Sequence, residues 1–376
     1  MCLAPRFPDV KANLGVSTTA FGVLISSGSI GALSAHLTMG HLVHRLGVFK
    51  VLMISTVATY LTLAGLVEAR NPWIYFVINV ICGFSWASYH IAVNAQALHR
   101  QAESGTRIIP MLHGLWSAGA VLTAFIALLI SSTISLHWHL LPLLGLVALL
   151  SLRSILRLRP HLLAGNEVTE ADEIVTFSQM IRSFSIDWVV SLGFLCAVIL
   201  EMLLGDWATI LARQEFGVSK SIAVIPYFLF MGAMILGRFG YARLGNKRSD
   251  KELVQPFVTM GGSIFIIGLF LGLSLKDSNL VLGYSIFCIA SLVAGFGMSF
   301  VGPLFFNYAS LRSGKSGGVA VAELGAVNQV LSWVARMVFA VIAGTATLPI
   351  AMIMPAVMSI LVAFFIAAAS QPRGHK

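Results

Sequence analysis

The chain is predicted to be an all-α membrane protein whose helices cross the bilayer many times. Hydrophobic residues make up 57% of its 376 residues and charged residues only 10%, which leaves too little polar surface to cover a soluble globule. Apolar stretches of about 20 residues, the length that spans a hydrocarbon core of about 30 Å, follow one another almost end to end. Because only helices and closed barrels satisfy their own backbone in lipid, and barrel strands are shorter than this, the stretches are predicted to be helices.

Eleven spans are predicted, and a long polar gap divides them into two bundles. The spans cover residues 18–42, 48–68, 73–98, 110–134, 137–156, 188–211, 221–241, 255–275, 280–307, 318–343 and 347–369. The linker, residues 158–187, separates an N-terminal bundle (1–157, five spans) from a C-terminal bundle (188–376, six spans). Transporters are commonly built from matched repeats, so the unequal numbers predict that the first half lacks one span.

The N-terminal residues agree with a missing span. Residues 1–17, MCLAPRFPDVKANLGVS, resemble the outer end of a helix and its loop, and no signal peptide precedes them. We therefore expect the gene product to begin upstream with one more helix, which would give twelve spans. A genuine protein of eleven spans is the alternative.

The basic residues predict the orientation in the membrane, because Lys and Arg near span ends are retained on the cytoplasmic side. Of the 24 Lys and Arg residues, 17 lie in one alternate set of gaps, 6 lie in the other set, and Arg336 lies within a span. The larger set, in which we count Arg238, includes the linker and the C-terminus. The C-terminus is therefore predicted to be cytoplasmic. The net charge of +9 indicates this orientation and a contact with anionic lipid, with nucleic acid a poor alternative.

The sequence lacks the motifs of soluble catalysis. It contains no phosphate-binding glycine loop, no nucleophile elbow and no paired catalytic carboxylates, and its gaps are too short for a catalytic domain. The four cysteines are isolated, which predicts neither a metal site nor a disulfide framework. We expect no enzyme activity, no cofactor and no metal, and any energy used should come from an ion gradient.

The gap after the first span carries the clearest motif, GHLVHRLGVFK. It resembles the loop signature of the major facilitator superfamily, G-x-L-x-D-R-x-G-R-R/K, at these positions: Gly40, Leu42, Arg45, Gly47 and Lys50. The glycines are expected to permit a tight turn between two closely packed helices. His44 stands where the family usually has Asp, so the family's charge latch between halves is not assured here. A weaker echo, GRFGYARLGNKR from Gly237 to Arg248, lies at the equivalent gap of the second half.

Three further stretches resemble a little-characterised bacterial branch related to sugar permeases of the fucose-permease type. They are RFPDVKANLGVS, VNAQALHRQAESGTRIIPMLHGLWSAGA and EMLLGDWATILARQEFGVS. In that branch the first stretch follows helix one, which suggests the same truncation. The resemblance implies a fold of two helical bundles, a bacterial inner-membrane location, a small-molecule solute and a monomer.

Ionisable groups inside the predicted spans are the first functional candidates, because such groups are costly in hydrocarbon and rarely face lipid. Glu201 lies near the middle of its span, where its carboxyl group could load and release a proton near neutral pH. A neutral Glu201 hydrogen-bonded within the bundle is the alternative. Asp206 lies about 140° around the helix from Glu201, so the two should not share a face. We expect Asp206 to pair with Arg336, either as part of a gate or as a static pair that orients two helices.

Polar and aromatic residues of other spans are candidates for a solute cavity, since a sugar-like ligand is held by hydrogen bonds and ring stacking. Asn94 and Trp116 are expected to face each other across the short loop between their spans, with Gln96 and His113 nearby as interhelical contacts. The candidates in the second half are Asn307, Asn328 and Gln329. As the alternative, each of these residues could instead form hydrogen bonds that hold neighbouring helices together.

Two further sets concern movement. In the superfamily the helix that bears Glu323 packs beside the one that ends at Arg45, so we expect a contact between these residues that closes the cytoplasmic side; a carboxylate stabilised only by the helix dipole is the alternative. A hinge is expected at a cluster of helix-breaking residues, with ordinary small-residue packing as the alternative. Its members are Gly295, Gly297, Gly302 and Pro303.

Taken together, these features predict a secondary active transporter that moves a small, sugar-like solute by alternating access with a proton. Proton-driven efflux of drugs or metabolites is an alternative at the level of the solute. The same features would also fit a membrane receptor or scaffold without a transport cycle, or an inactive truncated permease. Import and export are not distinguished by these residues.

Overall fold

The computed structural model describes residues 3–104, 108–165, 184–244, 250–299, 301–313 and 317–370. These residues form helices and no strands. The elements of the first half are η1 (Ala4–Arg6), α1 (Phe7–Leu14), α2 (Thr18–Ser26), α3 (Gly28–Leu46), α4 (Val48–Glu68), α5 (Pro72–Ser104), α6 (Ile108–Ile130), α7 (Leu136–Leu158) and η2 (Arg159–His161). Those of the second half are α9 (Trp188–Phe216), η3 (Ile222–Val224), α10 (Ile225–Leu244), α11 (Asp250–Leu275), α12 (Leu280–Met298), α13 (Val301–Ser313), α14 (Gly317–Thr345), α15 (Leu348–Ala351) and α16 (Ile353–Ala369).

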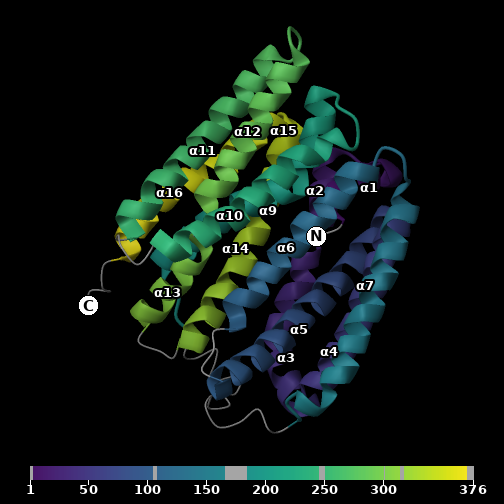
Figure 1. Cartoon of the computed structure of the whole chain (residues 1–376), viewed down its shortest axis with the longest axis vertical. Helices are drawn as coiled ribbons and strands as arrows, with labels where there is room; N and C mark the ends of the chain where they lie inside the picture. Colours follow the sequence, from purple (N-terminus) through teal and green to yellow (C-terminus); the bar gives the residue numbers. More distant parts are fainter. Residues whose placement is uncertain are drawn as a thin grey trace.

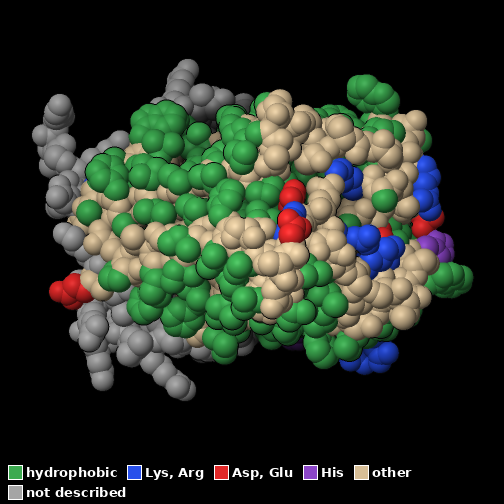
Figure 2. Space-filling view, turned by 90° about the horizontal axis from the view of Figure 1, so that it is seen from above, with side chains coloured by type: hydrophobic (Ala, Val, Ile, Leu, Met, Phe, Trp, Pro, Cys, Tyr) green, Lys and Arg blue, Asp and Glu red, His purple; other side chains and the backbone are tan. Residues whose placement is uncertain are grey.

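The helices match the predicted spans closely. Within the described ranges, nine helices are long and apolar enough to cross a membrane, and two shorter apolar helices, Gly114–Ile130 and Ile222–Arg238, fall on the two remaining predicted spans. Figure 2 shows the surface this produces: hydrophobic side chains cover most of the face, while charged side chains gather mainly toward one end. The predicted all-α membrane architecture is confirmed.

Two predicted spans are broken rather than continuous. The 18–42 stretch is interrupted at Ser27, between α2 and α3. There the Asn79 amide of α5 donates to the Leu24 carbonyl oxygen at 2.9 Å and to the Ser27 hydroxyl at 3.0 Å. Side chains that compete for backbone groups in this way offer the chain an alternative to the helical ladder. The 280–307 stretch is interrupted at Ser299, between α12 and α13.

The two halves repeat the same packing (Figure 1), with the purple-to-blue helices in one bundle and the green-to-yellow helices in the other. α3 packs on α5 as α10 packs on α12, α4 on α5 as α11 on α12, and α4 on α7 as α11 on α16. In the second half α9 contacts α10, α12, α13, α14 and α16. Among the described helices of the first half, none occupies the position that α9 has in the second.

Glycines set the closest of these helix crossings. A Cβ atom at Gly31 of α3 would lie 1.8 Å from the carbonyl oxygen of Val80 in α5. In the matching crossing of the second half, a Cβ atom at Gly295 would lie 2.2 Å from the carbonyl oxygen of Phe230 in α10. Small residues let helix backbones approach in this way. Gly295 is therefore fixed by close packing, which favours the alternative to its predicted hinge role.

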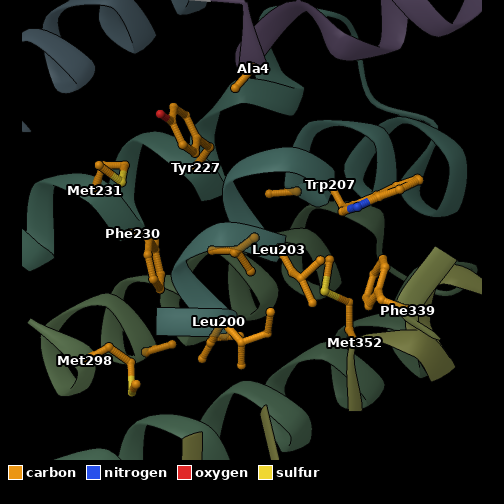
Figure 3. Close-up of a cluster of buried hydrophobic side chains, with 14 of the residues drawn as sticks. Ala4, Leu200, Leu203, Trp207, Tyr227, Phe230, Met231, Met298, Phe339 and Met352 are labelled. Carbon is orange, nitrogen blue, oxygen red and sulfur yellow. The ribbon is translucent and has the colours of Figure 1, made fainter. Parts of the chain in front are cut away.

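The core of the second half is built around α9, the most buried of the nine candidate spans. Figure 3 shows Leu200, Leu203 and Trp207 on this helix, surrounded by side chains of α10, α12, α14 and the chain near α15. Trp207 is 1% exposed and its ring lies 5.4 Å from that of Phe339. This apolar packing fixes the rotation of α9 and therefore the directions in which its two carboxylates point.

Candidate functional site

α9 directs its two carboxylates toward different helices. Its N-terminus is capped by Asp187, whose side chain accepts hydrogen bonds from the backbone N–H groups of Val189 and Val190. From there the apolar core residues hold one face, and Glu201 and Asp206 project from others. Glu201 lies beside Arg238 of α10, and Asp206 lies beside Arg336 of α14. The expectation that the two carboxylates occupy different faces is confirmed.

The expected ion pair between Asp206 and Arg336 is present. Nη2 of Arg336 donates to Oδ2 of Asp206, and the two side chains are only 16% and 15% exposed. Nε of Arg336 is buried and finds no hydrogen-bond partner among the described residues. A buried guanidinium with a spare donor can bind a further acceptor.

Asn328 belongs to the same face of α14 as this arginine. Asn328, Ser332 and Arg336 are spaced four residues apart, which places them one above another on the helix. The Ser332 hydroxyl lies 3.3 Å from Oδ1 of Asn328. Gln329 is half-buried on the neighbouring strip of the helix. These positions form a polar stripe on α14 that ends at the ion pair.

Glu201 has a partner that the sequence did not suggest. Nη2 of Arg238 lies 3.9 Å from Oε2 of Glu201, and the side chains are 30% and 21% exposed. Arg238, which was counted with the basic residues of the cytoplasmic gaps, lies inside α10, six residues before its end at Leu244. The signal that could have identified it is electrostatic: a carboxylate within a span requires a nearby cation, and Arg238 lies within the predicted 221–241 span.

Arg238 also bonds to two other helices. Its Nε donates to the Ser299 carbonyl oxygen at 3.0 Å, at the break between α12 and α13. Its Nη1 donates to the Ser117 hydroxyl at 2.7 Å, and Ser117 belongs to α6 of the first half. Arg238 thus joins the carboxylate of α9 to both halves of the molecule.

The cavity candidates of the first half lie on α5 and α6 but are not drawn together by any contact in the described part of the chain. Asn94 and Trp116 are both half-buried. Gln96 is interhelical, as expected: its amide donates to the His161 carbonyl oxygen at 3.2 Å, and its Oε1 accepts from the Leu163 backbone at 2.8 Å. The side chain of His113 lies outside the described residues.

An aromatic cluster on α5 escaped the sequence analysis. The rings of Trp86 and His90 lie 4.6 Å apart, and Trp86 is 38% exposed. Because Trp86, His90 and Asn94 follow at intervals of four residues, they share one face of α5. This spacing could have identified Trp86 and His90 from the sequence, since it places them on the same face of the helix as Asn94, within the two preceding turns.

In the loop motif of the first half, Gly47 occupies a backbone conformation that favours glycine. Gly47 has a φ of 79°, which favours glycine, and a Cβ atom there would lie 2.8 Å from the Gly165 backbone nitrogen. Gly40 instead lies within α3, and a Cβ atom there would meet nothing within 4 Å. The turn is therefore made by Gly47 alone. Arg45 and Lys50 are exposed, and Nδ1 of His44 is buried with no hydrogen-bond partner among the described residues.

Glu323 is placed within the second half. It is 8% exposed and lines a small pocket with Asp187 and Ser313. Arg45, its expected partner, is exposed at the end of α3. The side chains around Glu323 in this pocket therefore belong to the second half, whereas the predicted gate would have placed Glu323 against Arg45 of the first half.

The hinge candidates lie on both sides of the helix break. A Cβ atom at Gly297 would lie 2.5 Å from the Phe257 carbonyl oxygen, so Gly297 is a packing glycine like Gly295. Gly302 has nothing within 4 Å of a Cβ atom, and the side chain of Pro303 lies outside the described residues. Asn307 is exposed on α13. The break itself, at Ser299, precedes Pro303 by four residues.

The two halves also meet at the end of the molecule that carries loops 15–17, 131–135 and 217–221, here called the Asp9 end. Asp9 lies 2.7 Å from Nε of Arg6 and 2.5 Å from Nζ of Lys220 in the second half. Ser221 accepts from the Ser132 backbone at 3.1 Å, and the Ser221 backbone donates to the Ser132 hydroxyl at 3.0 Å. Reciprocal bonds of this kind hold the α6–α7 loop of one half against the start of α10 in the other.

Arg6 anchors this end from within. It is 1% exposed, although it carries a charge. Its guanidinium donates twice to the Ile134 carbonyl oxygen at 3.1 Å and lies 3.0 Å from Nδ1 of His139. Arg6 is one of the six basic residues in the smaller set of gaps, and its burial leaves no periodic pattern in the sequence that could have revealed it.

Comparison with known proteins gives a consistent result. Residues 1–335 match the family described as Major Facilitator Superfamily. An uncharacterized MFS-type transporter of Yersinia pestis is 28% identical over 331 residues, which cover 86% of this chain and 80% of the relative. An uncharacterized transporter of Sinorhizobium fredii is 24% identical over 326 residues, which cover 85% of this chain and 81% of the relative.

Solved structures share the fold at low sequence identity. The nucleoside transporter NupG has a TM-score of 0.69 at 15% identity, with 99% of this chain and 95% of that chain covered. A D-xylose-proton symporter has a TM-score of 0.68 at 15% identity, with 93% and 87% covered. The more specific resemblance to fucose permeases stays a prediction.

Proposed function

The chain belongs to the major facilitator superfamily of transporters, and we propose that it moves a small polar solute by alternating access, coupled to a proton. The observation that carries this proposal is the presence of two carboxylates well inside the central helix α9, each beside an arginine of a neighbouring helix. Ionisable side chains are costly in hydrocarbon, and in transporters they mark solute and proton pathways.

We assign the proton to Glu201 and a fixed negative charge to Asp206. Asp206 accepts a direct charge-assisted bond from Arg336, which favours its ionised form. Glu201 lies 3.9 Å from an arginine whose other donors are engaged with Ser299 and Ser117. The weaker compensation leaves Glu201 free to exchange a proton during the cycle.

The solute we propose is hydroxylated and carries a sugar ring. Its support is the set of polar and aromatic side chains on α5, α6 and α14: Trp86, Asn94, Trp116, Asn328 and Gln329. Two structures that share the fold are described as a nucleoside transporter and a D-xylose-proton symporter, and nucleosides and D-xylose both contain a pentose. Pentoses and nucleosides are therefore the first solutes to test.

We further propose that the protein lies in a bacterial inner membrane with its C-terminus in the cytoplasm, as a monomer of two bundles joined by the 158–187 linker. The orientation is supported by the distribution of Lys and Arg among the gaps. In this orientation the Asp9 end faces outward, and its bonds between the halves form the outer gate.

Proteoliposomes containing the full chain test the proposal. Uptake of radiolabelled D-xylose, other pentoses and nucleosides is measured with an imposed inward proton gradient, with and without a protonophore. Accumulation that the protonophore abolishes is the expected result. Glu201→Gln should abolish accumulation while leaving exchange of solute across the membrane, whereas Glu103→Gln, an exposed change beyond the spans, should leave both intact.

The competing functions give different results in the same assay. A receptor or scaffold would show no flux with any solute, and this outcome would overturn the proposal. An efflux antiporter would show proton-dependent loss of preloaded solute instead of accumulation.

A further inference from the structure

Arg238 of α10 contacts two other helices and the junction between α12 and α13, and each contact has a different chemistry. It faces the Glu201 carboxylate of α9, the Ser299 backbone carbonyl after α12, and the Ser117 hydroxyl of α6. A guanidinium presents its donors in a fixed planar fork, so these three partners must hold matching positions. If one partner moves and the guanidinium follows it, the hydrogen bonds of the guanidinium to the other two partners change.

The contact with Ser299 compensates for a missing backbone donor. In a continuous helix the N–H of residue 303 would donate to the carbonyl oxygen of residue 299. Residue 303 is proline, which has no N–H, so this carbonyl is left without its helical partner. Ser299 is 1% exposed, and a buried carbonyl needs another donor. Nε of Arg238 supplies it at 3.0 Å.

The residue before Arg238 makes this approach possible. A Cβ atom at Gly237 would lie 2.1 Å from the Ser299 hydroxyl oxygen. Any larger side chain would push α10 away from the break and carry the guanidinium with it. Gly237 and Arg238, which open the echo of the loop motif, thus both act on Ser299.

The contact with Ser117 crosses between the two halves. Ser117 is 1% exposed on α6, and α6 packs on α10 along the boundary of the two bundles (Figure 1). The 2.7 Å bond from Nη1 is charge-assisted and partly buried, and a hydrogen bond to a charged group contributes more than a neutral one. Its loss weakens the boundary on the side away from the Asp9 end contacts.

We propose that Arg238 is a coupling residue: through it, the charge on Glu201 controls both the break between α12 and α13 and the contact between the two halves. With Glu201 ionised, the guanidinium is compensated and stays on Ser299 and Ser117. With Glu201 neutral, the guanidinium is a half-buried cation without a counter-charge, which favours its withdrawal to a hydrated position. The carbonyl of Ser299 then loses its donor, and α6 loses its hold on α10. This inference rests on the proposed function only in requiring that the halves move.

The test measures the separation of the two halves in the absence of any solute. Spin labels are placed at Arg157 and Ser370, exposed positions of the first and second halves at the end opposite the Asp9 end, after Cys2, Cys82, Cys196 and Cys288 are replaced by alanine. Double electron–electron resonance on the full chain in nanodiscs then gives the populations of short and long distances. The bond between Arg238 and Ser117 on this side of the boundary predicts that short distances dominate in the parent protein.

The expected result is a shift toward long distances when the coupling is broken. Ser117→Ala, Arg238→Ala and Glu201→Gln should each change the population ratio by about tenfold, the effect of losing one charge-assisted hydrogen bond. Ser291→Ala is the matched control, because its hydroxyl is fully buried but bonds only within α12, to the Phe287 carbonyl oxygen. It should leave the ratio unchanged.

Combined variants separate coupling from simple damage. Glu201→Gln together with Ser117→Ala should shift the ratio no further than either change alone, because both act through Arg238. The proposal is overturned if the two effects multiply, or if Ser117→Ala behaves like Ser291→Ala. If Arg238→Ala fails to fold, the Glu201 and Ser117 variants still decide. Failure to find a transported solute in proteoliposomes would leave this result unaffected.

Discussion

Replacing Asp206 by asparagine should destabilise the protein strongly, because it leaves the Arg336 charge unpaired. Asn keeps the size of Asp but removes the negative charge. Both side chains are about 15% exposed, so solvent screens the pair only weakly. Removing one partner of a buried pair costs about 3–5 kcal/mol. The buried Nε of Arg336 already has no partner among the described residues, so no spare contact there offsets the loss.

The double replacement should cost far less than the two single ones together. Replacing Asp206 by leucine and Arg336 by methionine removes both charges and keeps apolar volume, which is often nearly neutral for a buried pair. Each single change should cost about 3 kcal/mol or more, so with a nearly neutral double replacement the coupling in a double-mutant cycle should reach roughly 6 kcal/mol.

Thermal unfolding of the purified protein in detergent, followed by tryptophan fluorescence, measures these effects at one fixed heating rate. Asp206→Asn should lower the apparent midpoint by roughly 5–15 °C, whereas Asp277→Asn, an exposed loop change, should leave it nearly unchanged. Equal midpoints for these two variants would refute the reasoning, as would single effects that simply add in the double variant.

Three other substitutions test the packing by the same measurement. Gly31→Ala should cost several kcal/mol or prevent folding, since its methyl group would lie 1.8 Å from a carbonyl oxygen of α5, while Gly114→Ala, with open space around it, should be neutral or stabilising by about 0.5–1 kcal/mol. Gly47→Ala should cost about 1–2 kcal/mol because its φ is 79°, and Gly40→Ala should cost nothing; similar midpoints would contradict the assignment of the turn. Arg6→Ala should lower the midpoint as much as a buried-pair variant, because the Arg6 side chain is 1% exposed and its removal leaves the Ile134 carbonyl oxygen and His139 without this partner. A shift under about 1 °C would show that these buried hydrogen bonds contribute little to stability.

The spans could be predicted from the sequence because one physical requirement dominates them. A helix of about 20 apolar residues is the solution that lipid permits, and it needs no knowledge of neighbours. The breaks could not be predicted, because a neighbouring helix makes them. Ser27 interrupts its span where Asn79, more than fifty residues away in sequence, captures local carbonyl groups. No residue near Ser27 in the sequence indicates that Asn79 will be its partner.

The two carboxylates of α9 likewise differ in how well their arginine partners could be predicted from the sequence. The pair of Asp206 and Arg336 could be predicted, since both residues lie well inside predicted spans and neither charge can be left alone there. Arg238 was not assigned as a partner, because it lies close to the end of α10, where the boundary of a span is uncertain by a few residues and the need of Glu201 for a cation is the one sequence signal. A basic residue at that depth fits equally well as an orientation signal or as the partner of Glu201.

The places of the two arginines connect the site to the boundary between the halves. Glu201 and Asp206 are five residues apart on α9, a separation of about 7.5 Å along the helix axis. Their partners lie on α10 and α14, and both of these helices pack on the first half, α10 on α6 and α14 on α2 and α3 (Figure 1). Each carboxylate of the central helix therefore acts on a different contact between the bundles. Because Asp206 holds its arginine directly while Glu201 shares Arg238 with Ser299 and Ser117, a change of charge on Glu201 should alter the α6–α10 contact and leave the α2–α14 contact in place.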